Sequence, residues 1–154
     1  VTMQNSIIFK NNAQKVRRIY NDQVVIGFAG SVADAFSLSE KFEEMLNKFA
    51  GNLMRSAVEL AQLWRTNKVM RQLEALMIVA DKNQVLIVDG TGNVIEPQDN
   101  ICAIGSGGNF ALAAAKALVQ NTNLSAKEIA EKALKIASEI CVFTNDHIIV
   151  EELN

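Results

Sequence analysis

Several features that would assign a protein to a specialised class are missing from this sequence. No apolar run approaches the roughly 18 residues that a bilayer-spanning helix needs. The first ten residues, VTMQNSIIFK, lack the charged-then-apolar layout of a signal peptide. The 15 Lys and Arg residues against 17 Asp and Glu residues leave a net charge of −2, which argues against a dedicated nucleic-acid binder. We therefore expect a soluble chain that binds neither membranes nor nucleic acid.

Cysteine, histidine and proline are also scarce. Cys102 and Cys141 lie in apolar segments, which favours buried thiols in a reducing compartment over a disulfide framework. His147 is the only histidine, and neither cysteine has a partner two or three residues away, so no side-chain metal cluster is expected. The single proline, Pro97, is expected in a turn inside the domain and not in a linker.

The length and composition indicate one globular domain over residues 1–154. A chain of 154 residues is in the usual range for a single domain. With 49% hydrophobic and 21% charged residues, the composition is that of an ordinary folded protein. No repeat or low-complexity segment suggests a domain boundary.

The hydrophobic patterns predict an α+β fold. Ser31 with Asp34, and Ser125 with Glu128, have the spacing of capping boxes at the starts of two helices. The segments LMIVA and VLIVD are apolar on both strand faces, so we favour a four-layer αββα sandwich in which two sheets pack face to face between helices. Strands are predicted at 5–9, 15–20, 23–29, 74–81, 84–90, 101–107 and 147–153, and helices at 32–49, 53–66, 109–121 and 125–142.

Three local motifs are candidates for chemistry, and each also has a purely structural interpretation. Lys15 would be costly to bury without a function, whereas charges on exposed strands often only prevent unwanted strand pairing. The amide of Gly30, at a strand end, is suited to donate to a developing oxyanion, or the glycine serves only the turn into the next helix. The IGSGG turn at 104–108, which contains Ser106, suits either phosphate binding or a tight structural turn.

A resemblance over the chain from Val1 to Leu153 connects these motifs. Six segments occur in order with consistent spacing: KVRRIYNDQVVIGFAGSVADAFSLSEKFE, ELAQLWRT, LEALMIVAD, AIGSGGNFALAAAKAL, LSAKEIAEKAL and HIIVEEL. Together they closely resemble the HslV (ClpQ) family, the peptidase subunits of the ATP-dependent HslUV protease, within the proteasome-related N-terminal nucleophile (Ntn) hydrolases. The resemblance implies an αββα fold and a threonine-type endopeptidase, in which an N-terminal threonine is the nucleophile and its free α-amine is the base.

The resemblance also assigns roles to residues of this chain. Lys15 matches the lysine that lies beside the threonine and electrostatically favours its reactive state. Gly30 matches the oxyanion-hole glycine, and Ser106 matches the serine near the α-amine. Arg17 and Arg18 are better interpreted as surface or subunit-contact residues.

The resemblance further implies a sodium ion, held by backbone carbonyls after the last long helix. Its positions fall on Ser138, Cys141 and Thr144. Ser138 stands where the family commonly has glycine, which matters little because the ligand is a main-chain oxygen, and carbonyls at a helix C-terminus suit a hard cation. No organic cofactor is implied.

The implied assembly is cytoplasmic and consists of two stacked hexameric rings of identical subunits. Unfolded proteins would be delivered to it by HslU (ClpY), an AAA+ ATPase, and ATP would be the ligand of that partner.

The chain departs from the family at its start, since the family's Thr-Thr strand and its Gly-Asp-Gly-Gln segment have no counterpart here. The nucleophile and the aspartate that supports the lysine would lie upstream of Val1, and Thr2 matches an interior family position. Either the natural polypeptide has a further N-terminal segment, which we favour because losing a central strand would cost many kcal/mol, or the chain is a truncated, inactive or structural ring subunit. A phosphate-binding module is the third alternative.

Overall fold

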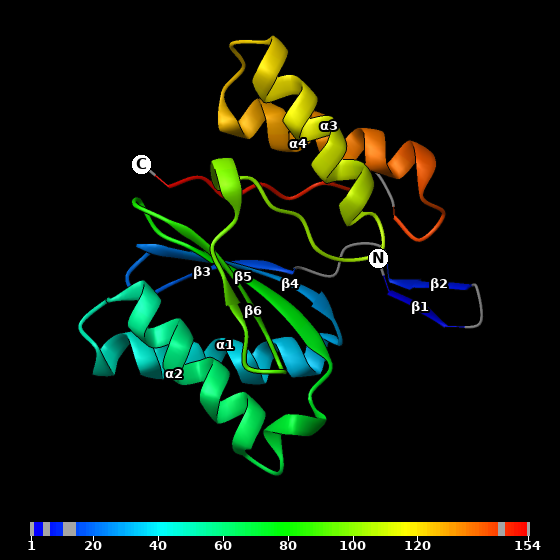
Figure 1. The fold of residues 1–154 in the computed structure, drawn as a ribbon. Coiled ribbons are helices and arrows are strands. Elements are labelled where there is room, and N and C mark those ends of the chain that lie inside the picture. The colour runs from blue at the N-terminus through cyan, green and yellow to red at the C-terminus, as the bar shows by residue number, and fades with distance from the viewer. Residues whose placement is uncertain (1, 5–6, 11–14, 145–146, 154) are drawn as a thin grey trace. The chain divides into compact units, whose positions relative to one another are not determined.

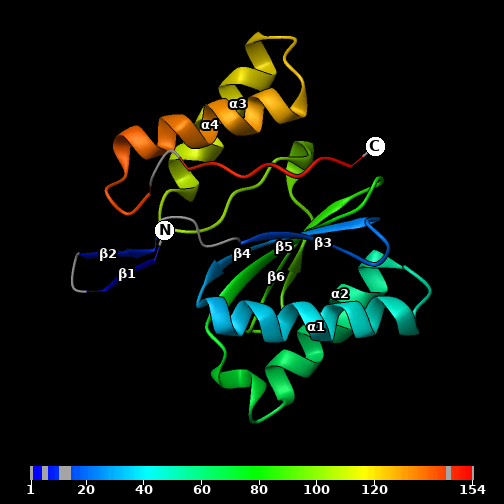
Figure 2. The same ribbon diagram turned by 180° about the vertical axis from the view of Figure 1, so that it is seen from behind.

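The computed structural model describes residues 2–4, 7–10, 15–144 and 147–153, and Figures 1 and 2 show it from opposite sides. Two compact units are present. The first, here called the helix-pair unit, contains Val1–Gln14 and Ile101–Glu152, and the second, the sheet unit, contains Lys15–Asn100 and Leu153–Asn154. Within the described part of the chain, no helix is long and apolar enough to cross a membrane.

The sheet unit is built on a five-stranded antiparallel sheet. The strands are β3 (Val16–Ile19), β4 (Val24–Gly30), β5 (Ala75–Ala80), β6 (Val85–Asp89) and β7 (Val94–Ile95), and they lie in that order. The two helices α1 (Val32–Lys48) and α2 (Leu53–Thr66) cover one face of this sheet (Figure 1). A short 3₁₀ helix, η1 (Met70–Gln72), follows α2, and another, η2 (Gln98–Asn100), follows β7.

Strand alternation places the core of this unit under the two helices. Every second residue of β4 is buried, and Ile26 and Phe28 thereby point to the helices, because successive side chains of a strand leave opposite faces. The largest fully buried side chain is that of Trp64, whose indole Nε1 donates to the carbonyl of Leu73. The other fully buried large side chains are those of Val24, Leu38, Phe42, Leu46, Leu53, Leu60, Met77, Val79, Leu86 and Val88.

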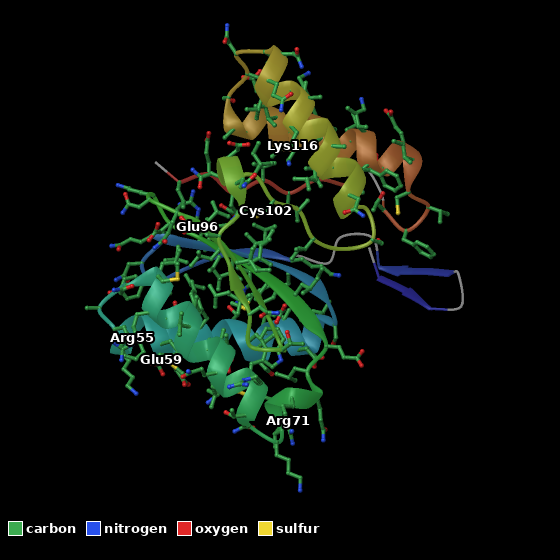
Figure 3. The ribbon with its side chains drawn as sticks, in the orientation of Figure 1. Arg55, Glu59, Arg71, Glu96, Cys102 and Lys116 are labelled. Atoms are coloured by element: carbon green, nitrogen blue, oxygen red, sulfur yellow. The ribbon has the colours of Figure 1, made fainter. Side chains whose placement is uncertain are left out.

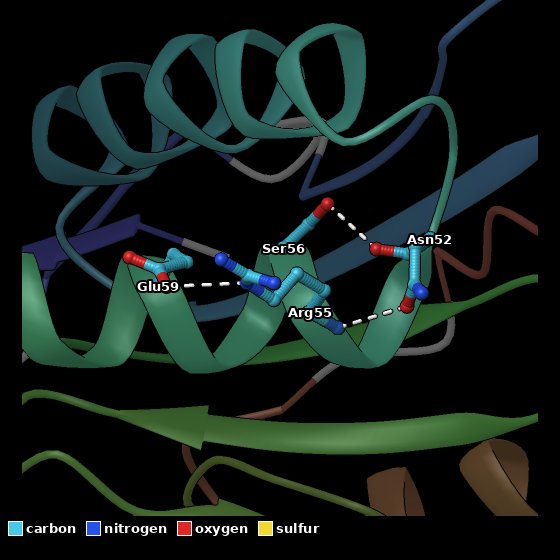
Figure 4. A network of polar contacts seen from close by, with 4 residues as sticks. All are labelled: Asn52, Arg55, Ser56 and Glu59. Atoms are coloured by element: carbon cyan, nitrogen blue, oxygen red, sulfur yellow. Dashed lines mark hydrogen bonds and ion pairs between the residues drawn. The ribbon is translucent and has the colours of Figure 1, made fainter.

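Local hydrogen bonds explain why α2 begins at Leu53. The Asn52 side-chain oxygen accepts from the Arg55 amide at 3.0 Å, and its carbonyl accepts from the Ser56 hydroxyl at 2.7 Å (Figure 4). One helical turn further on, Arg55 Nε donates to Glu59 Oε1 at 3.2 Å on the exposed face. The side chain of Asn52 therefore satisfies one of the amides that a helix start leaves without a partner.

The helix-pair unit contains an N-terminal hairpin and two packed helices. Strands β1 (Thr2–Gln4) and β2 (Ile7–Lys10) pair antiparallel. Helices α3 (Gly108–Asn121) and α4 (Ala126–Ile140) pack against each other, and their buried residues are mostly alanines, which permit a close approach. The predicted capping box at the start of α4 is confirmed, since Ser125 and Glu128 bond reciprocally through side chain and backbone.

Most predicted elements are confirmed within a few residues, but two predicted strands are wrong. Residues 101–104 and 147–153 have no regular secondary structure, and neither 101–107 nor 147–153 contains a strand. Apolar composition makes a segment compatible with a strand, yet a strand also needs a hydrogen-bonded neighbour. In the described residues, the ladders join only β1 with β2 and β3 through β7. The predicted strand 5–9 lies partly outside the described residues and otherwise within β2.

Candidate active site

Lys15 and Gly30 lie together at one end of the sheet unit. Lys15 directly precedes β3, and Gly30 is the last residue of β4, so the antiparallel pairing of the two strands makes them neighbours. The Lys15 ammonium Nζ donates to the Gly30 carbonyl at 3.1 Å. The main chain is tied at the same place, because the Phe28 amide donates to the Lys15 carbonyl at 3.0 Å.

The strand geometry also gives the direction of the Gly30 amide. Amides of alternate residues in a strand point to the same side. Because the Phe28 amide points to the β3 side, the Gly30 amide points there as well. The Ser31 amide points the other way and donates to the Glu74 carbonyl at 3.4 Å. The ammonium of Lys15 and the amide of Gly30 therefore lie on the same side of β4, and the oxyanion role of Gly30 stays a prediction.

Position 30 accepts only glycine, for two independent reasons. Its φ of +122° lies in a region that side chains rarely allow. A Cβ atom there would lie 2.5 Å from the Glu74 carbonyl oxygen and 2.9 Å from the Ala75 Cα atom. Backbone conformation and close packing alone are thus sufficient to explain why position 30 is glycine. They are also compatible with a catalytic role of its amide.

Arg17 has a contact of its own in this unit. Its guanidinium carbon lies 4.5 Å from the centre of the Phe36 ring on α1, a cation–π contact. Arg17 thus contacts a helix, while Lys15 contacts the strand end.

One interaction near Gly30 was not predicted from the sequence. The Asp34 carboxylate Oδ2 accepts from the Glu74 amide at 2.9 Å, across 40 positions of sequence. The Ser31–Asp34 spacing suggested only a local helix cap, and half of that cap is present, since the Ser31 hydroxyl accepts from the Asp34 amide at 3.4 Å. No local pattern reveals Glu74 as the second partner, because the contact depends on the pairing of β4 with β5.

Ser106 lies in the other unit, in the turn that leads into α3. Gly105 has a φ of +97°, and its carbonyl accepts from the Gly108 amide at 3.1 Å. Gly107 packs against the end of α4, where an added Cβ would lie 2.7 Å from the Thr144 Cγ2 atom. Backbone conformation at Gly105 and packing at Gly107 therefore explain why glycine occupies these two positions of the turn. Ser106, which lies between them, is exposed.

The three residues of the expected sodium site surround the C-terminal end of α4. Ser138 lies in the last turn, Cys141 is the C-cap, and Thr144 ends the turn that follows. The Cys141 carbonyl lies 3.2 Å from the Thr144 amide and 3.0 Å from the Thr144 hydroxyl, so a cation would share this oxygen with two donors. Neutral carbonyl oxygens at the negative end of a helix are ligands that a hard cation accepts. The sodium site therefore stays a prediction, based on three carbonyl-bearing residues near one helix end.

The two cysteines are free thiols that the site does not use as ligands. Cys141 is buried in the helix-pair unit, and Cys102 is half-buried in the segment that precedes α3 (Figure 3). Burial raises the pKa of the Cys102 thiol, which keeps it protonated and weakly nucleophilic.

Comparison with known proteins gives consistent matches over almost the whole chain. The family model described as "Proteasome subunit" matches residues 1–153. The "ATP-dependent protease subunit HslV" of Staphylococcus carnosus is 63% identical over 153 residues, which cover 99% of this chain and 86% of that protein. The protein of the same name from Listeria innocua is 62% identical over 155 residues, which cover 99% of this chain and 87% of that protein.

Solved structures agree with these matches. The crystal structure of eukaryotic HslV from Trypanosoma brucei superposes with a TM-score of 0.93 at 52% identity, covering 99% of this chain and 88% of that one. Thiobacillus denitrificans BPH in complex with epoxomicin has a TM-score of 0.67 at 19% identity, covers 89% of this chain and 77% of that one, and supports the fold alone. These likenesses confirm the predicted α+β sandwich class. The chain belongs to the proteasome subunit family and, within it, to the HslV group.

Proposed function

We propose that this chain is a subunit of the proteolytic core of an ATP-dependent protease, and that it acts as a threonine-type endopeptidase. The observation that carries the proposal is the Lys15–Gly30 pair, in which the Lys15 ammonium donates to the Gly30 carbonyl at 3.1 Å at the end of β4. The likeness to HslV subunits supports it, and so does the distribution of the matched positions over the whole chain.

In the proposed reaction, a threonine on a segment preceding Val1 supplies the nucleophile. Its α-amine takes the hydroxyl proton while the oxygen attacks the scissile carbonyl, which becomes an oxyanion. The Gly30 amide donates to this oxyanion, and the charge of Lys15 favours the reactive form of the threonine. The leaving amine takes the proton, and water then hydrolyses the acyl-enzyme. Ser106 would stand near the α-amine.

We further propose the assembly and ligands that the HslV group suggests. The subunit would form two stacked hexameric rings and receive unfolded proteins from the ATPase HslU, which would use the ATP. A sodium ion would be held by the carbonyls of Ser138, Cys141 and Thr144 and would steady the end of α4. This chain's own part would be to present those oxygens from the last turn of α4 and the turn that follows it.

The first experiment is to determine the intact mass and N-terminal sequence of the natural polypeptide, followed by a peptidase assay with the cognate ATPase and ATP. A threonine at the mature N-terminus, a particle of twelve subunits and ATP-dependent hydrolysis are expected. Assembly with the ATPase but no hydrolysis would instead favour an inactive, structural ring subunit. A monomer that hydrolyses nothing would contradict the proposal.

A further inference from the structure

At the start of α1, the acidic side chain of the helix cap accepts a hydrogen bond from a residue outside the helix instead of from the capping residue. In a capping box, the acidic side chain three residues after the cap bonds back to the amide of the capping residue. Here the Ser31 amide donates to the Glu74 carbonyl at 3.4 Å, and the Asp34 carboxylate accepts from the Glu74 amide at 2.9 Å. Both polar groups of the Glu74 backbone are thereby bound to the first turn of α1.

The second cap of the chain provides an internal comparison. Ser125 and Glu128 form a complete capping box, in which the glutamate reaches back to its own capping residue. Glutamate is one methylene longer than aspartate. At α1 the shorter Asp34 bonds to Glu74 instead. Asp34 therefore does not close the cap locally but connects α1 to Glu74, the residue directly before β5.

Glu74 is also the residue against which Gly30 rests. The Gly30 Cα lies so close to Glu74 that an added Cβ would approach the Glu74 carbonyl oxygen to 2.5 Å. Gly30 pairs with Ala75, which follows Glu74 and is the first residue of β5. The position of the Glu74–Ala75 backbone therefore limits the position of Gly30, whose amide points to the Lys15 side.

We propose that Asp34 is a positioning residue, which holds the Glu74 backbone and thereby fixes the Gly30 amide in the geometry that an oxyanion needs. This inference rests on the proposed peptidase function. In the proposed reaction, Asp34 contacts neither the substrate nor the reacting atoms. Its effect should appear in the turnover step, because an oxyanion donor acts on the transition state more than on bound substrate.

Two conservative substitutions separate this role from an ordinary helix cap. Asp34→Asn keeps an oxygen that accepts from the Glu74 amide but loses the charge at the start of α1. Asp34→Glu keeps the charge and is long enough to close a local box with Ser31, as Glu128 does with Ser125. A positioning role predicts that the asparagine variant is the more active of the two, whereas a capping or helix-dipole role predicts the reverse.

The test uses the natural full-length protein in its assembled state and a fluorogenic peptide. We expect Asp34→Glu to lower kcat about tenfold with little change in KM, and Asp34→Asn to stay within about twofold of the parent. The matched control is Asp81→Ala. The Asp81 carboxylate accepts from the Asn83 and Gln84 amides at 2.8 and 3.0 Å in the turn between β5 and β6, so this variant loses similar bonds away from Gly30 and should keep the parental kcat.

Hydrogen exchange provides a readout that does not need activity. The amides of Ser31 and Glu74 should exchange faster in Asp34→Glu, or in Asp34→Ala if the glutamate variant does not fold, and at the parental rate in Asp34→Asn. Unchanged exchange and unchanged kcat in both the glutamate and alanine variants would overturn the positioning role alone. A parent that assembles but hydrolyses no peptide would overturn the proposed function, and this role with it.

Discussion

The Nζ atom of Lys15 lies 3.1 Å from the carbonyl oxygen of Gly30, although the two residues are 15 positions apart. The contact exists because the hairpin of β3 and β4 returns the chain to its starting point. A lysine bonded to a strand end has fewer orientations than a free surface lysine, so less entropy is lost when a reaction needs its charge at that place.

Lys15→Ala should abolish peptide hydrolysis in the full-length protein and leave ring assembly intact. The substitution removes the cation that is bonded to the Gly30 carbonyl at the end of β4. Lys41→Ala is the control, because Lys41 lies on the exposed side of α1 in a 3.5 Å ion pair with Glu44. The turnover of a fluorogenic peptide measures the loss of hydrolysis, and the sedimentation coefficient measures whether the ring still assembles. Normal turnover in Lys15→Ala would refute the role of Lys15.

Two glycines of β4 should respond oppositely to alanine. Gly30→Ala combines a positive φ with a 2.5 Å contact to the Glu74 carbonyl, so we expect a loss of stability of at least about 1–3 kcal/mol. Gly27→Ala meets nothing within 4 Å and should be tolerated. Thermal unfolding of the two variants measures the difference. Equal unfolding temperatures would show that the β4 end has enough freedom to absorb a side chain at position 30.

The sequence predicted those helices and strands that have strong local signals. It did not predict features that depend on contacts with residues far away in the sequence. Helix α1 was predicted from its apolar spacing and from Ser31, which is its N-cap. The hairpin turn was predicted at Asn21 and Asp22, yet Tyr20 also has a positive φ. Its amide is held by the Glu43 carboxylate of α1 at 2.7 Å, a contact that no local pattern contains.

The candidate site shows the same division. Lys15 and Gly30 were each found as weak motifs, but composition and spacing did not place them in contact. Their contact depends on the β3–β4 register. Asp34 was interpreted as part of a local cap because the capping pattern is defined within four residues, whereas its partner Glu74 is 40 residues away. Contacts between site residues on different strands therefore cannot be predicted from local sequence patterns and become visible only in the structure.

The start of α2 offers a test that separates a helix cap from a surface ion pair. Asn52→Ala removes the oxygen that accepts from the Arg55 amide, which should cost about 1 kcal/mol. Arg55→Ala removes the exposed ion pair with Glu59 and should cost less than about 0.5 kcal/mol through that pair. Arg55 also lies 4.6 Å from the Phe49 ring centre, so Glu59→Ala isolates the ion pair. A larger loss in Glu59→Ala than in Asn52→Ala would contradict this ranking.

Asp89 should make stability depend on pH at the acidic end. Burial would raise the pKa of Asp89, but hydrogen bonds from Thr91 and Asn93 together outweigh it and hold the pKa below its ordinary value. The stabilisation is therefore complete above the unfolded-state pKa and is lost as the pH falls through the lower folded-state pKa. Thermal unfolding of Asp89→Asn and the parent should differ most near neutral pH and converge in acid. A constant difference between pH 2 and 7 would contradict this assignment.

The contact between Gly107 and Thr144 predicts a compensating pair of substitutions. Gly107→Ala would place its Cβ 2.7 Å from the Thr144 Cγ2 atom, whereas the next neighbours, the Cβ atoms of Ala137 and Cys141, lie at 3.6 and 3.8 Å. Overpacking of this kind costs about 1–3 kcal/mol. Thr144→Ser removes the obstructing methyl group and keeps the hydroxyl that lies 3.2 Å from the Ala137 carbonyl and 3.0 Å from the Cys141 carbonyl.

The double variant should consequently be more stable than the sum of the single effects predicts. A double-mutant cycle on unfolding free energies measures the coupling, which we expect to be favourable by about 1 kcal/mol. Thr144→Val is the counterpart, because it removes the hydroxyl while keeping a methyl group against Gly107, and it should relieve nothing. If Gly107→Ala costs as much with serine at position 144 as with threonine, the methyl contact does not limit position 107. The glycine would then be required by the turn itself, not by its packing against the end of α4.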